Sequence, residues 1–233
     1  MTVRRIVTSR SGGVSTGPYA SFNLGDRVGD DPAAVAANRR RLADAAGLAP
    51  DAVIWMEQIH GATVQVVDGP RTGPVEATDG LVTATPGIAV AVLVADCVPV
   101  LLADPVGGVV GSVHAGRVGA AAGVIPRAVE AFRSAGGDPA RSDVLLGPAV
   151  CGACYEVPPD MQAAVESRLP GSAVRTRQGT PGLDLRAGLA RQLAGLGVDR
   201  IVTDPRCTAE DPELYSHRRD GTTGRQAGVA WIS

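Results

Sequence analysis

The chain has 233 residues, of which 45% are hydrophobic and 20% are charged, and its formal net charge is −2. This balance excludes the strongly basic surface that binds nucleic acids or anionic membranes. All 22 basic residues are arginine, which excludes lysine Schiff-base chemistry and a P-loop lysine and leaves anion binding to guanidinium and backbone groups.

Apolar segments of strand length alternate with segments of helical periodicity along the chain, without a clean βαβ repeat. Asp31 followed by Pro32 is typical of a helix start, and Gly47 is suited to end that helix. The predicted strands cover residues 3–8, 51–67 (broken at 60–61), 78–83, 88–94, 98–103, 109–114, 142–147, 201–203 and 229–232. The predicted helices cover residues 32–46, 120–135 (with a kink or late start at Pro126), 160–169 and 184–195. We therefore expect a single mixed-sheet α/β domain over residues 1–233.

The four cysteines are too few, in a chain of this length, for a disulfide scaffold. The first residues, MTVRRIVTSRSGG, lack the apolar core of a signal peptide. The longest apolar run is interrupted by Asp96 and Pro99 and is too short to span a bilayer. We therefore expect a cytoplasmic, reduced protein with no membrane partner.

Residues 87–119 carry the side chains that we expect to do chemistry. Two apolar runs flank Asp96 and Cys97, and a third run ends at His114. Runs of this kind suit strands that are buried on both faces. A carboxylate, a thiol and an imidazole are costly to bury there unless something pairs with them or coordinates them.

Only three histidines are present, His60, His114 and His217. The first two lie at predicted strand ends and are followed by small residues. If His60 and His114 converge with Cys97, the three ligands leave a fourth position open, which is the pattern of catalytic rather than structural zinc. Zinc in such a site would lower the pKa of bound water to about 7. The alternative is that the histidines bond to backbone carbonyl groups and that the cysteine only packs.

The pair Cys151 and Cys154 is a second candidate metal site. Together with Cys207 and His217 it would form a closed Cys3His zinc site. The partners are far apart in the sequence, so packing within a loop is the simpler interpretation of the pair.

Three motifs resemble those of the YfiH-type, or laccase-domain, family: MEQIHG at 56–61, ADCVPVLLAD at 95–104 and GSVHAGRVG at 111–119. The segments SFNLGDRVGDDP, LGPAVCGACYEV and SHRRDGTTGRQA extend the resemblance over nearly the whole chain. Members of this family, once called multicopper polyphenol oxidases, are now described as purine nucleoside phosphorylases with adenosine deaminase activity. The resemblance implies a layered α/β/β/α fold and zinc bound by His60, Cys97 and His114.

The chain departs from the family pattern at two places. Arg117 stands where the family usually has tryptophan, and no aromatic residue precedes the arginines of SHRRDG. We therefore expect His217 to lie outside the shared site.

A multicopper oxidase is excluded by the number of imidazoles. A blue copper site alone takes two histidines and a cysteine, and a trinuclear copper centre needs more than the chain has left. Zinc is the expected metal, and copper is the alternative because mixed nitrogen and sulfur ligands also bind it.

The resemblance implies phosphate and a purine nucleoside as substrates, with adenosine, inosine, guanosine and methylthioadenosine as candidates. Deamination requires an acid that shuttles a proton to the base. Asp96 and Asp79 are the candidates, and the alternative for both is to orient a histidine. With His60, Cys97 and His114, Asp96 completes the predicted catalytic set.

Phosphorolysis requires cations that hold phosphate against the anomeric carbon. Arg39 and Arg225 are the candidates, because a guanidinium fork matches phosphate. Asn23 and Gln58 are candidates for hydrogen bonds to ribose or base, or else they anchor loops.

Two other classes of function remain open at this stage. Cys97 could act as the nucleophile of a metal-independent cysteine hydrolase or amidase on cell-wall precursors, with a histidine as its base. A non-catalytic zinc module that serves a partner protein is the other alternative. The expected oligomeric state is a monomer or a weak homodimer.

Overall fold

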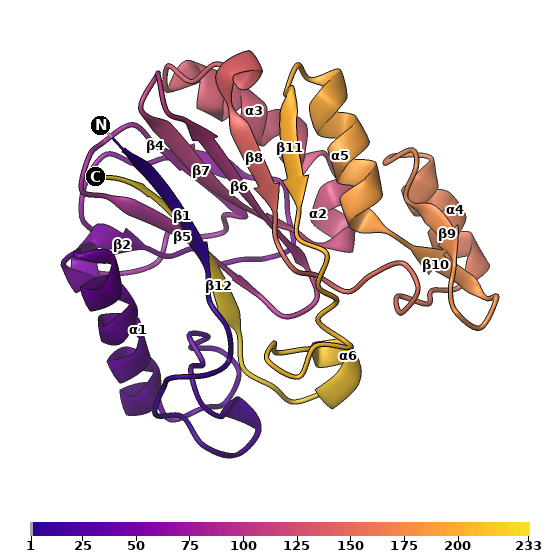
Figure 1. Ribbon diagram of the computed structural model, residues 1–233, viewed down its shortest axis with the longest axis horizontal. Helices are drawn as coiled ribbons and strands as arrows, with labels where there is room; N and C mark the ends of the chain where they lie inside the picture. The colour runs from indigo at the N-terminus through magenta and orange to yellow at the C-terminus, as the bar shows by residue number, and fades with distance from the viewer. Residues whose placement is uncertain (1) are drawn as a thin grey trace.

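Two β-sheets stack face to face, and helices cover their outer faces (Figure 1). The computed structural model describes residues 2–233. The apolar layer between the sheets is formed by residues of both, with Val90 and Val92 from one sheet and Leu101 and Val110 from the other. The predicted α/β/β/α architecture is therefore confirmed.

The first sheet has the order β1-β12-β5-β2, and it pairs segments from both ends of the chain. Its strands are β1 (Val3–Val7), β12 (Gln226–Ile232), β5 (Ala89–Val94) and β2 (Val53–Ile54). Only β2 runs parallel to its neighbour. Helix α1 (Pro32–Ala46) covers its outer face through Leu42 and Ala43. Both faces of β5 are thus covered, which explains why its sequence is apolar at every position.

The second sheet has the order β11-β8-β6-β7-β4-β3. Its strands are β11 (Arg200–Thr203), β8 (Asp143–Leu146), β6 (Val98–Asp104), β7 (Val109–Ala115), β4 (Gly80–Thr83) and β3 (Val64–Val66). The outer pairs β11–β8 and β3–β4 are parallel, and the inner pairs are antiparallel.

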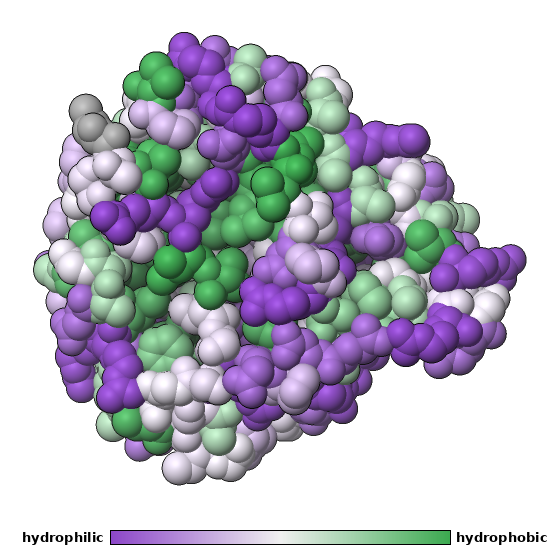
Figure 2. Space-filling model, in the orientation of Figure 1, coloured by the Kyte–Doolittle hydropathy of each residue, from purple (hydrophilic) through white to green (hydrophobic). Residues whose placement is uncertain are grey.

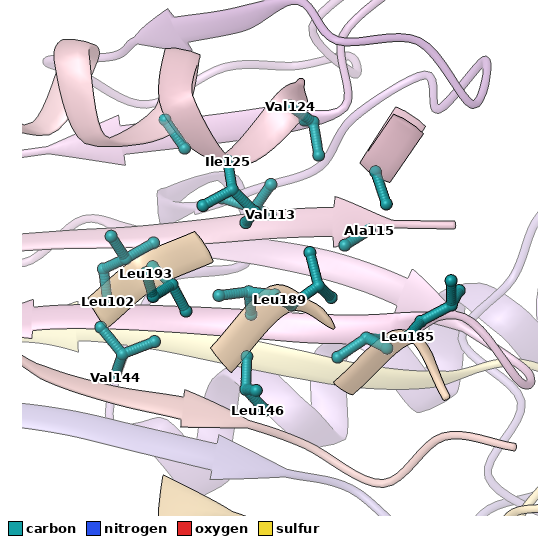
Figure 3. Close-up of a cluster of buried hydrophobic side chains, with 14 of the residues drawn as sticks. Leu102, Val113, Ala115, Val124, Ile125, Val144, Leu146, Leu185, Leu189 and Leu193 are labelled. Carbon is teal, nitrogen blue, oxygen red and sulfur yellow. The ribbon is translucent and has the colours of Figure 1, made fainter. Parts of the chain in front are cut away.

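Helices α3 (Val124–Ser134) and α5 (Leu185–Gly195) cover the outer face of the second sheet. Figure 3 shows their contact with it, where Ile125, Leu189 and Leu193 lie against Leu102 and Val113. All five side chains are at most 1% exposed. This layer holds β6 and β7 rigidly, and those two strands carry the chemistry-bearing residues to one edge of the sheet.

Most of the predicted elements are present within a few residues of their expected ends. Helix α1 begins after Asp31, whose side chain accepts a hydrogen bond from Ala33 N, and it ends at Gly47 in the left-handed conformation. The predicted helix 120–135 is two helices, α2 (Arg117–Ala121) and α3, because Gly123 at φ +85° breaks the path. Pro126 lies in the first turn of α3, where its missing N–H is not needed.

Several features were not predicted, among them the 3-10 helices η1 (Gly17–Tyr19), η2 (Pro50–Ala52) and η3 (Pro139–Arg141). A small hairpin, β9 (Ala173–Arg175) with β10 (Pro181–Leu183), lies beside α4 (Pro159–Glu166), and a short helix α6 (His217–Asp220) precedes the last strand. On the face seen in Figure 2, hydrophobic and hydrophilic residues intermingle. Hydrophilic residues gather at the tip of the projection that α4, β9 and β10 form at the right. Between residues 2 and 233, no helix combines the length and apolar character needed to cross a membrane.

Candidate active site

His60, Cys97 and His114 meet at one edge of the second sheet. His60 lies in the turn between β2 and β3, Cys97 lies just before β6, and His114 lies on β7. One donor atom from each residue lies within 4.8 Å of the other two. The two imidazole rings are 4.7 Å apart between centroids at an interplanar angle of 68°. The structure thus brings together the three residues on which the sequence hypothesis depends.

Asp79, at the start of β4, holds the two histidines in place. Its fully buried carboxylate accepts hydrogen bonds from the backbone N–H groups of residues 59, 60 and 61, at 3.3, 3.0 and 2.6 Å. The same carboxylate lies 2.8 Å from His114 Nδ1. These bonds hold His60 at φ +59°, a conformation that few non-glycine residues adopt. Asp79 therefore orients His114 and leaves its Nε2 free for a ligand.

The thiol and the imidazole perturb each other. Burial raises the pKa of Cys97, but His114 and His60 outweigh this effect and bring it down to about 6. Burial lowers the pKa of His114, but Cys97 and Asp79 raise it to about 9. Asp79 itself has a lowered pKa, because its bonds to His114 and to backbone N–H groups outweigh its burial. Near neutral pH the pair therefore favours a thiolate beside an imidazolium, and a metal cation would take the place of the proton.

Glycine permits the close approach of these groups. A Cβ atom on Gly116 would lie 2.9 Å from His60 Nδ1 and 3.0 Å from Cys97 Sγ. A Cβ atom on Gly119 would lie 2.5 Å from Gly61 O. The HAGRVG segment, which passes from β7 into α2, can therefore pack against the turn of His60 only with glycine at both positions.

Asp96 precedes Cys97 in the left-handed conformation, at φ +88°. Its Oδ1 accepts hydrogen bonds from Thr208 Oγ1 at 2.6 Å and from Ser216 Oγ at 2.7 Å, and its Oδ2 accepts one from Arg218 N at 2.6 Å. Asp96 is therefore the residue that ties the C-terminal segment to the Cys97 loop.

A pocket of about 460 Å³ opens beside the three residues, all of which line it. Its size lies in the range of small-molecule sites. Charged and polar residues form much of its wall: Asp26, Arg27, Glu57, Gln58, Asp96, Arg117, Tyr155, His217, Arg218 and Arg225. The fourth position of a three-ligand metal site therefore has space for a substrate.

The two arginines predicted to bind phosphate lie in different surroundings. Arg225 lines the pocket, and its Nη1 donates hydrogen bonds to Thr223 O and Gly224 O. Arg39 lies outside the lining, where its guanidinium is 4.2 Å from the centroid of the Trp55 ring and bonds to Leu24 O. Burial lowers the pKa of both arginines.

The two amide residues predicted to contact the nucleoside are bonded to the backbone. Gln58 lines the pocket, but its side chain exchanges two 2.8 Å hydrogen bonds with the backbone of Leu93. Asn23 is fully buried outside the lining, and it bonds to Gly25 O, Gly25 N, Arg225 N and Asp30 Oδ2. The contacts of both residues thus agree with the alternative that they anchor loops.

Sequence reasoning missed Tyr155 and Arg218 as parts of the pocket wall. Arg218 lies over the Tyr155 ring at 5.0 Å, and Arg117 lines the same pocket. His217, expected to lie outside the site, also lines the pocket, with its Nδ1 2.7 Å from Gly221 O. The sequence feature that could have indicated Arg218 is the segment SHRRDG, because so polar a segment is unusual just before a buried strand.

The donor set fits a single metal ion. Two imidazole nitrogens and one thiolate, with a carboxylate behind one imidazole, form a donor set that suits zinc and also accepts copper. The residues described include no further histidine in this donor group, so it does not supply the imidazoles of a trinuclear copper centre.

Two stacked sheets with a cysteine–histidine donor group at the mouth of a pocket define a mixed α/β protein of the YfiH type. The family model described as multi-copper polyphenol oxidoreductase laccase matches residues 4–233, and the chain belongs to this family.

A purine nucleoside phosphorylase of Corynebacterium glutamicum is 59% identical over 232 residues, which cover 99% of this chain and 94% of that protein. Among solved structures, YlmD of Geobacillus stearothermophilus is 35% identical with a TM-score of 0.92, over 99% of this chain and 92% of that one. YfiH of Bacillus licheniformis is 31% identical with a TM-score of 0.92, over 99% and 93%. These matches confirm the fold and the family expected from the motifs.

Proposed function

We propose that this protein is a zinc-dependent phosphorylase of purine nucleosides, with adenosine deaminase as a second activity. The observation that carries the proposal is the group His60, Cys97 and His114 at the wall of a pocket that arginine side chains also line. The name of the Corynebacterium relative supports the substrate class. Adenosine, inosine, guanosine and methylthioadenosine are the candidate nucleosides.

Zinc would be held by His60, Cys97 and His114, and when bound it supplies a Lewis acid that activates water or polarises an oxygen. Asp79 keeps His114 in the tautomer whose Nε2 faces the other two donors. Gly116 leaves the space in which the donors converge. These residues of the chain therefore fix the site before any ligand binds.

Phosphorolysis needs phosphate to be held beside the anomeric carbon while the glycosidic bond breaks. Arg225 is the residue that we assign to phosphate, because it lines the pocket and two backbone carbonyl groups orient its guanidinium. Arg117 and Arg218 line the pocket with Tyr155 and add positive charge there. Because Arg218 covers one face of the Tyr155 ring, we assign purine stacking to the other face.

Deamination needs a proton donor near the purine amino group. Asp96 is the pocket carboxylate next to Cys97, and we keep it as the candidate acid. Because Asp96 already accepts three hydrogen bonds, Asp96→Asn also loosens the C-terminal segment. Measuring both reactions in Asp96→Asn separates the two roles. If Asp96 is the acid, only the rate of deamination falls. If Asp96 only positions the C-terminal segment, the rates of both reactions fall.

Replacing His114 with alanine tests the proposal directly. We expect the variant to lose the zinc held by the group of His60, Cys97 and His114. Its turnover of nucleosides, with or without phosphate, should fall below about 10⁻³ of the normal rate. His217→Ala is the matched control, because His217 lines the same pocket but is outside the donor group. Retained turnover in a His114→Ala protein whose pocket group holds no metal contradicts the mechanism.

Phosphate binding is tested by the two arginines. We expect Arg225→Gln to raise the KM for phosphate about tenfold or more, with a smaller effect on the KM for the nucleoside. Arg39→Gln removes the same charge from outside the pocket and should leave the KM for phosphate close to normal. If instead Arg39→Gln raises the KM for phosphate and Arg225→Gln does not, phosphate is bound by Arg39.

The second candidate function is a metal-independent cysteine hydrolase or amidase, and the low pKa of Cys97 favours it. The two candidates differ in their response to chelation. A thiol hydrolase keeps its activity when zinc is removed and loses it on alkylation, whereas the zinc enzyme loses activity on chelation and regains it when zinc is returned.

A further inference from the structure

Three of the four cysteines gather outside the pocket. One donor atom from each of Cys151, Cys154, Cys207 and Glu210 lies within 4.8 Å of the others. None of these residues lines the pocket described above. Cys207 is buried, Cys151 and Cys154 are half-buried, and Glu210 is exposed. The nucleoside chemistry proposed above uses none of them.

Two turns of the same geometry supply these four side chains. In the first, Cys151 O accepts hydrogen bonds from the N–H groups of residues 154 and 155, at 3.0 and 2.9 Å. In the second, Cys207 O accepts hydrogen bonds from the N–H groups of residues 210 and 211, at 3.1 and 2.8 Å. Each turn therefore presents two side chains spaced three residues apart, as paired-ligand turns do in structural zinc sites.

The two turns are held directly against each other. Ala149 and Cys207 form a parallel β-bridge, and Thr208 N donates to Ala149 O at 3.2 Å. Cys151 N donates to Cys207 Sγ at 3.3 Å. This N–H group favours the thiolate form of Cys207, which is the form that binds a metal. Burial outweighs it in the metal-free protein and raises the pKa of Cys207.

Charge around the group suits an anionic metal complex. Glu210 is held by Arg177, whose Nη2 lies 2.5 Å from Glu210 Oε1. Three thiolates and a carboxylate around a divalent cation carry excess negative charge, and Arg177 lies where it offsets part of it. In a tetrahedral zinc site with Zn–S bonds of about 2.3 Å, sulfur atoms lie roughly 3.8 Å apart, so the donors need only contract slightly.

We propose that Cys151, Cys154, Cys207 and Glu210 bind one zinc ion in a closed structural site. Three sulfur donors and one oxygen favour zinc over magnesium or calcium. All four positions are filled by protein, so no position is open for catalysis. His217, the fourth ligand considered from the sequence, lies outside this group, and Glu210 takes its place.

The site would fix one wall of the pocket. The first turn leads into Tyr155, and the second turn contains Thr208, which bonds to Asp96. An ion that joins the turns would hold Tyr155 and the Asp96 contact at a constant separation. The expected consequence of losing this zinc is a lower melting temperature and a looser pocket, with the His60, Cys97 and His114 group still able to bind metal.

The test uses the full chain with the pocket donors removed. Cys97→Ser/His114→Ala protein is equilibrated with zinc, passed through a desalting column and analysed for metal and for free thiols. We expect about one zinc per chain, and none after Cys154→Ser and Cys207→Ser are added. Cobalt in place of zinc should give sulfur-to-metal charge-transfer absorption that the added substitutions abolish. This measurement does not depend on nucleoside turnover. The structural zinc site can therefore be refuted while the proposed function holds, and the proposed function can be refuted while the zinc site holds.

Glu210→Gln provides a variant that should keep the fold, because Glu210 is exposed. We expect it to weaken zinc binding by about tenfold or more in the same background. Glu130→Gln, at an exposed position on α3, is the matched control. Two results overturn the proposal. One is a folded Cys97→Ser/His114→Ala protein that retains no zinc. The other is a mass lower by two hydrogens together with a peptide map that locates a disulfide between two of the three remaining cysteines.

Discussion

The two groups of side chains that could hold a metal differ in what surrounds them. His60, Cys97 and His114 come from two sheet-edge turns and a strand, and they face a pocket with a buried carboxylate behind them. Cys151, Cys154, Cys207 and Glu210 come from two matching turns that lie against each other outside the pocket. Similar donor atoms are thus arranged for an open position in one case and for closure in the other. The surroundings, more than the ligand types, decide what a metal could do.

The largest expected contrast is in thiol reactivity after metal is removed with a chelator. The pKa of Cys97 is about 6, whereas burial and the neighbouring thiols raise the pKa of Cys154 to about 12. At pH 7 about 90% of Cys97 and roughly 10⁻⁵ of Cys154 should be thiolate. We expect iodoacetamide to label Cys97 at least about 10³ times faster, measured by peptide mass spectrometry over time.

The pH dependence of that labelling has a defined sign. Because the pKa of Cys97 is lowered, its labelling rate should stay constant above about pH 7 and fall tenfold per unit below about pH 6. In His114→Ala the thiol loses its main stabilising partner, so the fall should begin at a higher pH. Equal labelling of all four cysteines at pH 7 contradicts the distinction between the two groups.

Asp79→Asn should affect the open group and leave the closed one unchanged. The amide keeps the shape of the side chain but loses the charge that faces His114 Nδ1. Loss of such a partner typically weakens metal binding by about 10–100-fold. Zinc titration with a competing chelator measures this, in the Cys154→Ser/Cys207→Ser background so that only the open group is titrated. If the affinity for zinc is unchanged, Asp79 does not support the group of His60, Cys97 and His114.

Gly116→Ala tests the space between the donors. The added Cβ would lie at 2.9 and 3.0 Å from His60 Nδ1 and Cys97 Sγ, so these atoms must move apart. The backbone at Gly116 has φ −77°, which alanine adopts without strain. We expect zinc affinity at the open group to fall about tenfold, roughly 1.4 kcal/mol, with little change in the far-ultraviolet circular dichroism spectrum. Gly69→Ala is the control, since its added Cβ would meet nothing within 4 Å.

Thr208→Val should have the smallest effect, because it touches the contact between the two groups and neither donor set. The substitution removes the hydroxyl that donates to Asp96 and keeps the size of the side chain. A hydrogen bond of this kind contributes about 1 kcal/mol. We expect KM for the nucleoside to rise roughly fivefold while both zinc ions remain bound. Loss of either metal shows that Thr208 supports more than the Asp96 contact.

Much of the fold is encoded locally. The Asp31–Pro32 start and Gly47 end of α1 depend on neighbouring residues. The buried strands β5, β6 and β7 follow from runs that are mostly apolar. The β9–β10 hairpin was missed because its strands are three residues long and one contains proline and glycine. Short strands owe their pairing to tertiary contacts that no local pattern reveals.

The residues of the candidate site likewise fall into those that local sequence reveals and those that only tertiary contacts reveal. His60, Cys97 and His114 were found because polar donors stand out among apolar strands and because the motifs resemble a family. Glu210 was missed because CTAE is an ordinary loop sequence until its partner turn lies beside it. Asn23 and Gln58 show the reverse case, since sequence marks a buried amide but does not indicate whether it bonds to ligand or to backbone.

The position of β12 has a consequence for synthesis. This strand lies between β1 and β5, although the ribosome makes it long after both of them. Until residues 226–232 emerge, β1 and β5 have no partner between them, and their exposed edges can pair wrongly. Cotranslational folding of this sheet must therefore wait until residues 226–232 have been made, and ribosomes stalled before residue 226 should hold chains that proteases digest readily.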